Sequence, residues 1–276
     1  MIAALVSSFN RKSKTINCIE SLLKYSFIKI YLFDDGSTDG TLEEIMSNFP
    51  EVVIFKSKND MYWSRSMSLL MEMSFLDGFK YFLLINDDVV FHSNIIDKFL
   101  GLYNEISLNG LHILVGATQS AKNHELTYSG MVRNSLTNPL NFKRKELSSH
   151  LSEVETFNGN CVIFSRGVIE EIGYIDKLFS HGLGDFDYGL RAKSMGIKIY
   201  LAPFYIGFCE RNSTKNTNLD EKLPIKKRIE FVFSRKGIPI YDFIVYSRRH
   251  GGRFWLINYI RTYLVVIYRS IEVGCK

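Results

Sequence analysis

The stretch Ile28-Lys-Ile-Tyr-Leu-Phe-Asp34-Asp35-Gly36-Ser-Thr-Asp39-Gly-Thr41 joins a short apolar run to an acidic, glycine-rich turn. The run predicts a buried β-strand, and Gly36 permits a tight bend after it. Asp39 or Thr41 can cap a following helix, so a turn and a cap explain the second half. They leave Asp34 and Asp35 unexplained, because two adjacent carboxylates repel each other at a strand end. Such carboxylates can accept hydrogen bonds from a nucleobase or a ribose, which predicts a nucleotide site.

Similar elements recur on both sides of this stretch. Apolar runs that predict strands cover residues 2–7, 28–33, 52–55, 81–85 and 113–116, and helical spacing covers residues 14–25, 42–47, 66–76 and 95–106. This alternation predicts an α/β fold, with a Rossmann-like, mainly parallel sheet flanked by helices. Ligands of such sheets bind at the carboxyl ends of the strands, where the polar motifs of this chain fall.

The second half of the chain is less regular. Residues 119–156 show weak periodicity and predict a loop-rich excursion that shapes an acceptor pocket. Strands are expected at residues 161–165 and 198–202, and helices near residues 168–172 and 186–194. Connecting chain is expected from Pro203 to about Pro239.

The tripeptide Asn86-Asp87-Asp88 ends the most hydrophobic predicted strand. Buried carboxylates are costly unless a cation or hydrogen-bond donors meet them. Carboxylate oxygens suit Mg²⁺ or Mn²⁺, which complete their shell with water and substrate phosphates. The alternative is a helix N-terminus, but Asp88 stands five residues before Ser93, which is itself a good cap. A divalent metal site is therefore the favoured interpretation.

Taken together, these motifs resemble those of the family 2 glycosyltransferases, whose catalytic domain has the GT-A fold. The likeness covers residues 1–213 and extends to bacterial surface-polysaccharide enzymes such as rhamnosyl and galactosyl transferases. It implies that Ser7, Phe9, Asp34 and Asp35 contact the nucleotide and that Asp88 binds the metal. Asp87 would lie beside the ribose or the metal-bound phosphate. The chain departs from the family's Asp-x-Asp pattern in having Asn86 at the first acidic position.

The segment Asp60-Met-Tyr-Trp63-Ser-Arg65 falls where the family has a polar loop over the donor. Arg65 could neutralise phosphate, and Trp63 could pack on the sugar or the base. The equally weighted alternative is a helix start whose aromatic side chain folds onto the core.

A second acidic segment, Gly184-Asp185-Phe-Asp187-Tyr-Gly-Leu-Arg191, opens a predicted helix. Asp187 and Arg191 are spaced to pair along that helix, although Asp187 also remains a candidate acceptor contact. Asp185 has no such explanation, and it resembles the family's catalytic base, the second acid of a Glu-Asp-x-Asp pattern. Gly184 stands where the family has the glutamate.

Two further residues are candidates for the sugar or acceptor site. Asn158 precedes a predicted strand and either contacts the sugar or acceptor or forms a plain turn. His181 is an acceptor contact, a metal ligand or an ordinary loop histidine, with the last favoured. Many relatives offer a metal-binding histidine after the last strand, but here that stretch reads Ile206-Gly-Phe-Cys209.

Positive charge is concentrated at the C-terminal end. Residues 221–276 carry 12 Lys and Arg against 4 Asp and Glu, whereas residues 1–220 carry 22 against 25. Basic residues there alternate with large apolar ones, which favours a membrane surface over nucleic acid. Residues 214–276 are therefore expected to form a helical, membrane-associating extension. The alternative is a helix packed on the enzyme's own core or on a second subunit in a homodimer.

The cysteines and the N-terminus bear on the compartment. Cys18, Cys161, Cys209 and Cys275 are far apart and suggest neither a disulfide framework nor a zinc site. The N-terminus lacks the features of a signal peptide, and no apolar run approaches the ~18 residues that span a bilayer. The expectation is a cytoplasmic enzyme, peripheral on the inner face of the plasma membrane.

The favoured function is an inverting glycosyltransferase that moves a hexosyl or deoxyhexosyl group from a UDP- or dTDP-sugar to a saccharide, expected to be lipid-linked. Mn²⁺ or Mg²⁺ is the expected cofactor. One rival is a nucleotidyltransferase, which a basic glycine-rich loop near the first strand would favour, but Ser7-Ser-Phe-Asn-Arg11 lacks glycine. A non-catalytic scaffold is disfavoured because the chain holds Asp35, Asp88 and Asp185. A dinucleotide oxidoreductase is disfavoured because G-x-G-x-x-G is missing.

Overall fold

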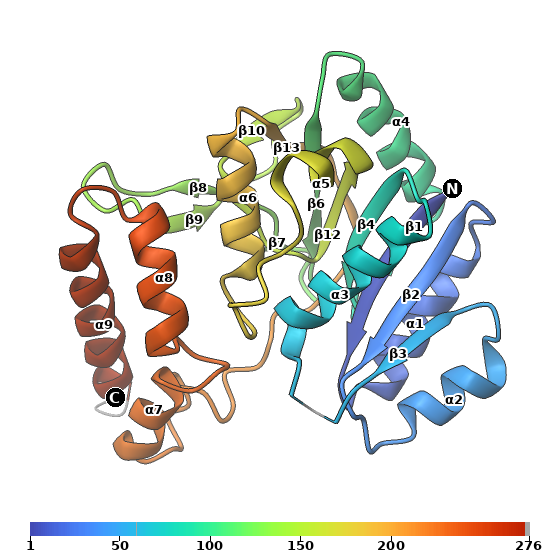
Figure 1. The fold of residues 1–276 in the computed structure, drawn as a ribbon. Coiled ribbons are helices and arrows are strands. Elements are labelled where there is room, and N and C mark those ends of the chain that lie inside the picture. The colour runs from blue at the N-terminus through green and yellow to red at the C-terminus, as the bar shows by residue number, and fades with distance from the viewer. Residues whose placement is uncertain (59, 274–276) are drawn as a thin grey trace.

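The computed structural model describes residues 1–58 and 60–273, so Cys275 lies outside the described residues. Within them, one large sheet forms the centre of the molecule (Figure 1). Its main strands are β1 (Ile2–Ser8), β2 (Ile28–Asp34), β3 (Val53–Lys56), β4 (Tyr81–Asn86), β6 (His112–Gln119), β10 (Ser152–Val154), β12 (Cys161–Ser165) and β13 (Lys198–Phe208). They lie in the order β10, β13, β6, β12, β4, β1, β2, β3.

The first strands bring the acidic motifs to one edge. β1 pairs in parallel with both β2 and β4, and its register places Ser8 opposite Asp34 and Ser7 opposite Asn86. The carboxyl ends of these three strands are therefore level with one another. The mainly parallel α/β sheet is the predicted one, and the two acidic motifs meet where the sequence placed them.

One central strand runs against this direction. β12 is antiparallel to both β4 and β6, while β13 is parallel to β6. β13 was expected to end near Ala202 but continues to Phe208. Pro203 cannot donate to a ladder, and the register shifts between Leu201 and Tyr205 accommodate it as an irregularity. The prediction of connecting chain directly after Pro203 is therefore wrong.

Helices cover both faces of the sheet. α1 (Lys12–Leu23), α2 (Thr41–Asn48) and α4 (Ile95–Ser107) pack on one face, and α3 (Tyr62–Leu76), α5 (Arg166–Ile172) and α6 (Gly184–Ser194) pack on the other. β1 shows why the sheet is buried on both sides. Its Ala3 and Leu5 join one apolar core, whereas Ala4 and Val6 join the core on the opposite face.

The predicted loop-rich excursion contains short strands. β7 (Leu126–Tyr128) pairs with β6 of the main sheet, whereas β5 (Val90–Phe91), which comes before this stretch, pairs with β13. β8 (Gly130–Arg133), β9 (Phe142–Arg144) and β11 (Thr156–Phe157) form a separate small sheet. Strands this short leave too little periodicity for the sequence pattern to reveal them.

Three helices follow the sheet: α7 (Ile225–Val232), α8 (Ile240–His250) and α9 (Trp255–Glu272). They stand together beside α6 in Figure 1. Phe179 and Leu190 of the sheet domain share a third apolar core with side chains from these helices, namely Val232, Phe243, Tyr246 and Tyr263. The inner side of the extension, residues 214–276, thus packs on the rest of the enzyme. This was one of the two alternatives that the sequence left open. α7 lies within the stretch expected to be connecting chain, which corrects that expectation.

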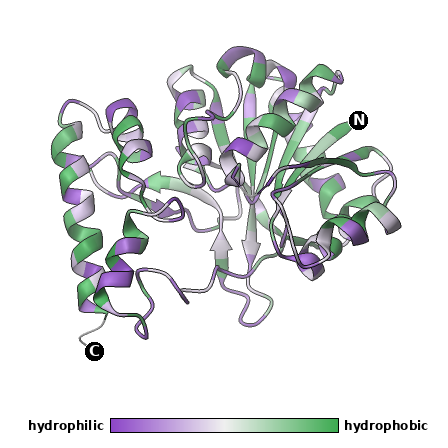
Figure 2. Cartoon of the chain, turned by 60° about the horizontal axis from the view of Figure 1, so that its bottom comes forward, coloured by the Kyte–Doolittle hydropathy of each residue, from purple (hydrophilic) through white to green (hydrophobic). Residues whose placement is uncertain are grey.

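The outer side of α9 is apolar. Ile257, Leu264 and Tyr268 are 62%, 64% and 65% exposed. Hydrophobic residues recur along the length of this helix in Figure 2. No helix within the described part of the chain is both long enough and apolar enough to cross a membrane.

Candidate active site

The two acids after β2 have different surroundings, although both are buried. Asp34 accepts hydrogen bonds from the amides of Gly36 and Ser37 through Oδ1, at 3.1 and 2.9 Å. Its Oδ2 has no partner among the described residues. A buried acceptor without a partner costs free energy, so this oxygen is the one in the pair that still requires a donor.

The carboxylate of Asp35 is satisfied by its own chain. It accepts from the amide of Tyr62 at 2.8 Å, the amide of Met61 at 3.2 Å and the hydroxyl of Ser57. Asp35 therefore holds the start of α3 against the end of β2. This local role satisfies the carboxylate without a nucleotide, and the predicted nucleotide contact of Asp35 stays a prediction.

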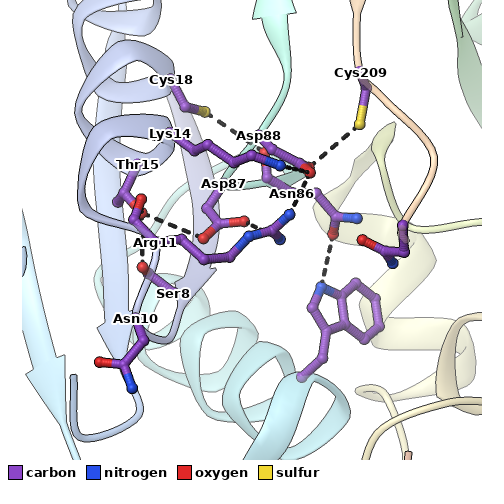
Figure 3. Close-up of polar contacts among 12 residues, drawn as sticks. Ser8, Asn10, Arg11, Lys14, Thr15, Cys18, Asn86, Asp87, Asp88 and Cys209 are labelled. Carbon is purple, nitrogen blue, oxygen red and sulfur yellow. Dashed lines mark hydrogen bonds and ion pairs between the residues drawn. The ribbon is translucent and has the colours of Figure 1, made fainter. Parts of the chain in front are cut away.

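Asp87 and Asp88 contact the side chain of Arg11, which belongs to none of the predicted motifs (Figure 3). The guanidinium of Arg11, on the β1–α1 connection, donates to Asp87 Oδ1 at 2.8 Å and to Asp88 Oδ2 at 2.5 Å. Lys14 lies 3.3 Å from Asp88 Oδ2. Both carboxylate side chains are at most 5% exposed. Their costly burial is thus offset by two cations of the chain itself.

Burial dominates the titration of this pair. It raises the pKa of Asp87 to about 6, against the lowering effect of Arg11, and the neighbouring charge of Asp88 adds to the increase. Thr15 donates to the second oxygen of Asp87 at 3.3 Å. Burial would lower the pKa of Arg11, but the charges of Asp87 and Asp88 outweigh it and raise that pKa. The buried carboxylates of Asp87 and Asp88 are therefore strongly stabilised by nearby positive charge.

Cys209, the residue directly after β13, also contacts this pair. Its thiol donates to Asp88 Oδ1 at 3.3 Å, and burial raises the pKa of that thiol. A protonated thiol is a hydrogen-bond donor rather than a metal ligand. Cys209 thus helps to orient Asp88.

A divalent cation can bind Asp88 only when the cationic side chains that contact this carboxylate move away. Within residues 1–58 and 60–273, no three His, Cys, Asp or Glu side chains form a ready metal site. Mg²⁺ needs only one or two carboxylates when substrate phosphates and water supply the rest. Asp88 fits that requirement once Arg11 and Lys14 withdraw, and the partly exposed Arg11 side chain has room to do so.

Trp63 connects this cluster to α6. Its indole N–H donates to Asn86 Oδ1 at 2.9 Å. A Cβ on Gly159 would lie 2.3 Å from the Trp63 ring, so the ring packs directly on this backbone. The amide of Gly159 in turn donates to Asp185 Oδ2 at 3.0 Å. Asn86, Trp63, Gly159 and Asp185 thus form one continuous wall.

Asp185 lies in the first turn of α6, partly exposed at the surface of that wall. Loss of hydration raises its pKa to about 6, although the amides of Gly159 and Phe186 favour the ionised form. It forms no ion pair with any residue that the structure describes. A carboxylate whose pKa is near neutrality, without a cationic partner, suits a general base.

The glycine before Asp185 has a packing reason. A Cβ on Gly184 would lie 2.4 Å from Ser64 Oγ and 2.8 Å from Ser64 Cβ. Ser64 is bound to the preceding loop, because its amide donates to Ser180 O and its hydroxyl to His181 O. Contact between α3 and α6 therefore excludes the family's glutamate at this position.

Asp187 is fully buried and anchors α6. Arg191 Nε donates to it at 2.8 Å, which confirms the pairing predicted from the spacing. Arg249 and His250 of α8 reach its other oxygen at 3.1 and 2.9 Å. Burial alone would raise the pKa of Asp187, but His250 and Arg191 outweigh it and lower that pKa. These contacts fasten the C-terminal helices to the helix of Asp185.

The remaining candidates lie around the same strand ends. Ser7 and Phe9 are half-buried at the end of β1, and Asn158 is half-buried beside Gly159. Arg65 instead donates to the carbonyl of Lys177 at 3.1 Å. His181 packs edge-on against Tyr62, with 6.1 Å between ring centroids.

Backbone strain gathers at this place too. Six described non-glycine residues have positive φ, and three of them flank the site: Asn10 at 52°, Tyr62 at 57° and Leu183 at 72°. Bulky side chains rarely adopt this conformation, and strain of this kind is frequent at functional sites. It supports the assignment of these strand ends as the site.

Comparisons with known proteins bear on the family and the fold of this chain. The profile of the family described as Glycosyltransferase like family 2 matches residues 1–222. No curated protein matches the chain. The fold is similar to that of S. aureus TarS 1–349 in complex with UDP-GlcNAc, with a TM-score of 0.56 and 13% identity over 99% of this chain and 83% of that chain. It is also similar to a second S. aureus TarS structure, with a TM-score of 0.56 and 12% identity over 99% of this chain and 50% of that longer chain.

At these identities the solved structures establish the fold, which is the GT-A-like arrangement that the motifs led us to expect. Family membership rests on the profile, which covers the strands, the acidic motifs and the helix of Asp185. Because it matches residues 1–222 of the 276 in the chain, this protein belongs to the glycosyltransferase-like family 2.

Proposed function

We propose that this protein is an inverting glycosyltransferase that moves a sugar from a nucleoside diphosphate to a hydroxyl group of an acceptor. Family membership supports a glycosyltransferase that uses a nucleotide-sugar donor. One observation carries the reaction type: Asp185, with its pKa raised to about 6, shares a wall with the Asn86 end of the acidic strand. A donor bound along the strand ends would present its anomeric carbon to an acceptor beside Asp185.

Separate residues of the chain bind the nucleotide and accept the proton in this reaction. Asp34 offers its unpaired oxygen to the nucleotide, while Asp35 holds the loop that borders the nucleotide site. Asp185 accepts the proton of the acceptor hydroxyl as that oxygen forms a bond to the anomeric carbon. The bond from this carbon to the diphosphate oxygen breaks on the opposite side, and the configuration inverts. A positioned base of this kind contributes about 10²–10⁴ in rate.

Asp88, with the donor's phosphates, would hold a divalent cation, with Mn²⁺ and Mg²⁺ as the candidates. When bound, the cation supplies Lewis-acid stabilisation of the leaving diphosphate. Arg11 and Lys14, released from Asp88, remain within reach of the same phosphates because they start 2.5 and 3.3 Å from that carboxylate.

We extend the proposal to the donor and acceptor classes. TarS 1–349 was solved with UDP-GlcNAc, which supports a UDP-sugar as the first donor to test, with dTDP-sugars next. The apolar and basic outer side of α9 supports a lipid-linked saccharide acceptor at a membrane surface, as in assembly of a bacterial surface polysaccharide. Residues 1–213 would form the catalytic domain, and residues 214–276 the extension that brings it to the membrane.

The test is release of the nucleoside diphosphate from a panel of UDP- and dTDP-sugars, with Mn²⁺ or with EDTA. The wild type should release it from at least one donor, and Asp88→Ala should lose that release. Asp97→Ala, on the helix α4, is the matched control that removes a carboxylate elsewhere. If the wild type neither binds nor cleaves any donor of the panel, the proposal fails. Release of pyrophosphate from a nucleoside triphosphate plus a sugar phosphate would instead establish the rival nucleotidyltransferase.

A further inference from the structure

The turn between α7 and α8, residues 233–239, reaches from the C-terminal helices to the candidate nucleotide site. The guanidinium carbon of Arg235 lies 5.3 Å from the centroid of the Tyr62 ring. Lys236 Nζ lies 6.0 Å from the centroid of the Phe9 ring. Phe9 follows β1 and Tyr62 begins α3, so the turn spans two segments that border the site. We call residues 233–239 the α7–α8 turn.

This turn is held in one conformation by its own backbone. The amide of Gly237 donates to Ser234 O at 3.0 Å, and the amide of Ile238 donates to Val232 O at 2.6 Å. The hydroxyl of Tyr263 on α9 donates to Ile238 O at 2.7 Å. A Cβ on Gly237 would lie 2.2 Å from Phe231 O, so this close packing requires glycine. The turn is therefore built to present Arg235 and Lys236 in a fixed place.

The residues that the α7–α8 turn contacts are also held in a fixed conformation. Tyr62 adopts a left-handed backbone conformation, and its amide is bound by Asp35. His181 packs edge-on against Tyr62, and its Nδ1 is buried without a partner among the described residues. Burial and then the charge of Lys236 lower the pKa of His181, which favours the neutral ring. A neutral imidazole can offer a hydrogen bond beside the two cations.

Arg235 and Lys236 lack the partner that cations of this kind require. Both are exposed, and neither forms an ion pair with a residue in the described ranges 1–58 and 60–273. By contrast, Arg249 and Arg191 of the neighbouring helices are paired with carboxylates. Two adjacent cations that lack an ion-pair partner among the described residues suit the diphosphate group of a nucleotide. The base and ribose of that nucleotide would lie at the strand ends, near the aromatic rings.

We infer that Arg235 and Lys236 bind the diphosphate of the sugar donor, so that the C-terminal extension completes the donor site. This inference rests on the proposed function, in which the donor binds along the strand ends. The inference makes residues 214–276 more than a means of attachment. The cations of the α7–α8 turn would hold the leaving diphosphate.

The test compares nucleotides that differ only in the diphosphate. Affinities for UDP and uridine are measured by calorimetry with Mn²⁺ present, for wild type, Arg235→Ala and Lys236→Ala, and likewise for dTDP and thymidine. Each variant should bind the diphosphate about 10-fold more weakly or worse, the loss expected for one hydrogen bond to a charged group, and should bind the nucleoside as the wild type does. Arg248→Ala and Lys226→Ala are the controls, because each removes an exposed positive charge of the same extension.

The outcomes separate the two proposals. If the wild type binds UDP or dTDP and both variants bind it equally well, the turn has no role in the donor site and the inference fails alone. An equal loss of nucleoside and diphosphate affinity also defeats it, since the effect is then not on phosphate. A variant that changes only the KM for a phosphate-containing acceptor would assign the cations to that acceptor and overturn the inference. If the wild type binds neither nucleotide, the inference and the proposed function fail together.

Discussion

Four aspartates at or near the strand ends have different surroundings, which give them different roles. Asp34 retains an unpaired oxygen, whereas Asp35 is used by its own chain. Asp88 is bound by two cations, while Asp185 has only amide donors. The residue type is the same in each case, so the neighbours decide between ligand, brace and base.

Asp185→Asn tests the base. The amide keeps the size of the side chain but cannot accept the acceptor's proton, so transfer should fall by about 10²–10⁴ while donor affinity is unchanged. Transfer is followed by product formation and donor affinity by calorimetry. Asp97→Asn, on the exposed side of α4, is the control. Retained transfer in Asp185→Asn would place the base elsewhere.

The pH dependence of transfer follows from the same group. The pKa of Asp185 is raised to about 6, so the carboxylate is ionised above that pH and protonated below it. Because only the ionised form accepts a proton, kcat should rise with pH through about 6 and level off above. Donor affinity must be measured over the same range, because the pKa of Asp87 is also about 6. A kcat that is flat between pH 5 and 7 would contradict the assignment.

Arg11→Met tests whether the carboxylate pair accepts a metal ion. Removing the guanidinium leaves two buried carboxylates with only Lys14 nearby, which should lower the free energy of unfolding by on the order of 3 kcal/mol. Mn²⁺ should then raise the melting temperature of Arg11→Met more than that of the wild type, because Arg11 no longer competes for Asp88. Thermal unfolding with Mn²⁺ or EDTA measures both effects. Equal metal responses of the two proteins would speak against a cation at Asp88.

At the scale of elements, the site depends on how closely α3 and α6 approach. Gly184 and Ser64 face each other in this contact, and the Gly159–Trp63 packing closes the same wall. A small residue on one helix therefore sets the distance of Asp185 from the acidic strand end. This contact gives a packing reason for glycine at position 184.

Gly184→Ala should lower the free energy of unfolding by about 1–3 kcal/mol, the usual cost of overpacking, and should reduce transfer by moving Asp185. In the double variant with Ser64→Gly, the loss should be smaller than the sum of the two single losses. Gly101→Ala is the matched control, since a Cβ at this α4 position meets nothing within 4 Å. Denaturant unfolding measures all four variants. If Gly184→Ala is as stable as Gly101→Ala, the close approach does not constrain the helix.

At the scale of the whole molecule, the C-terminal helices have two faces. Their inner side is buried with Phe179 and Leu190, while Arg249 and His250 bind Asp187 next to the site. The outer side of α9 combines exposed Ile257, Ile260 and Leu264 with the basic Arg261 and Arg269. Such a surface suits a bilayer that carries anionic lipid.

Substituting Ile257, Ile260 and Leu264 by serine should weaken binding to vesicles of anionic phospholipid without unfolding the protein, because all three are at least half exposed. Vesicle sedimentation at low and high salt measures the effect. The control carries serine at Met46, Leu76 and Leu108, which are exposed apolar residues of the catalytic domain. Unchanged vesicle binding, together with a shift from dimer to monomer in ultracentrifugation, would show that α9 joins two subunits instead.

The sequence by itself determined the alternation of strands and helices, the level strand ends and the acidic motifs on them. These follow from local periodicity and from the fixed direction of parallel strands, so residues 28–41 and 86–88 could be placed without coordinates. It also determined the Asp187–Arg191 pair, because one helical turn separates the two residues.

Only the tertiary structure decided which groups meet those acids. Arg11 reaches Asp87 across 76 positions of chain, and Arg249 reaches Asp187 across 62. It also decided that β13 passes through Pro203, that α7 forms, and that Arg235 and Lys236 come to lie against Tyr62 and Phe9. Contacts between distant segments depend on the packing of whole elements, and no local pattern of residues records that packing.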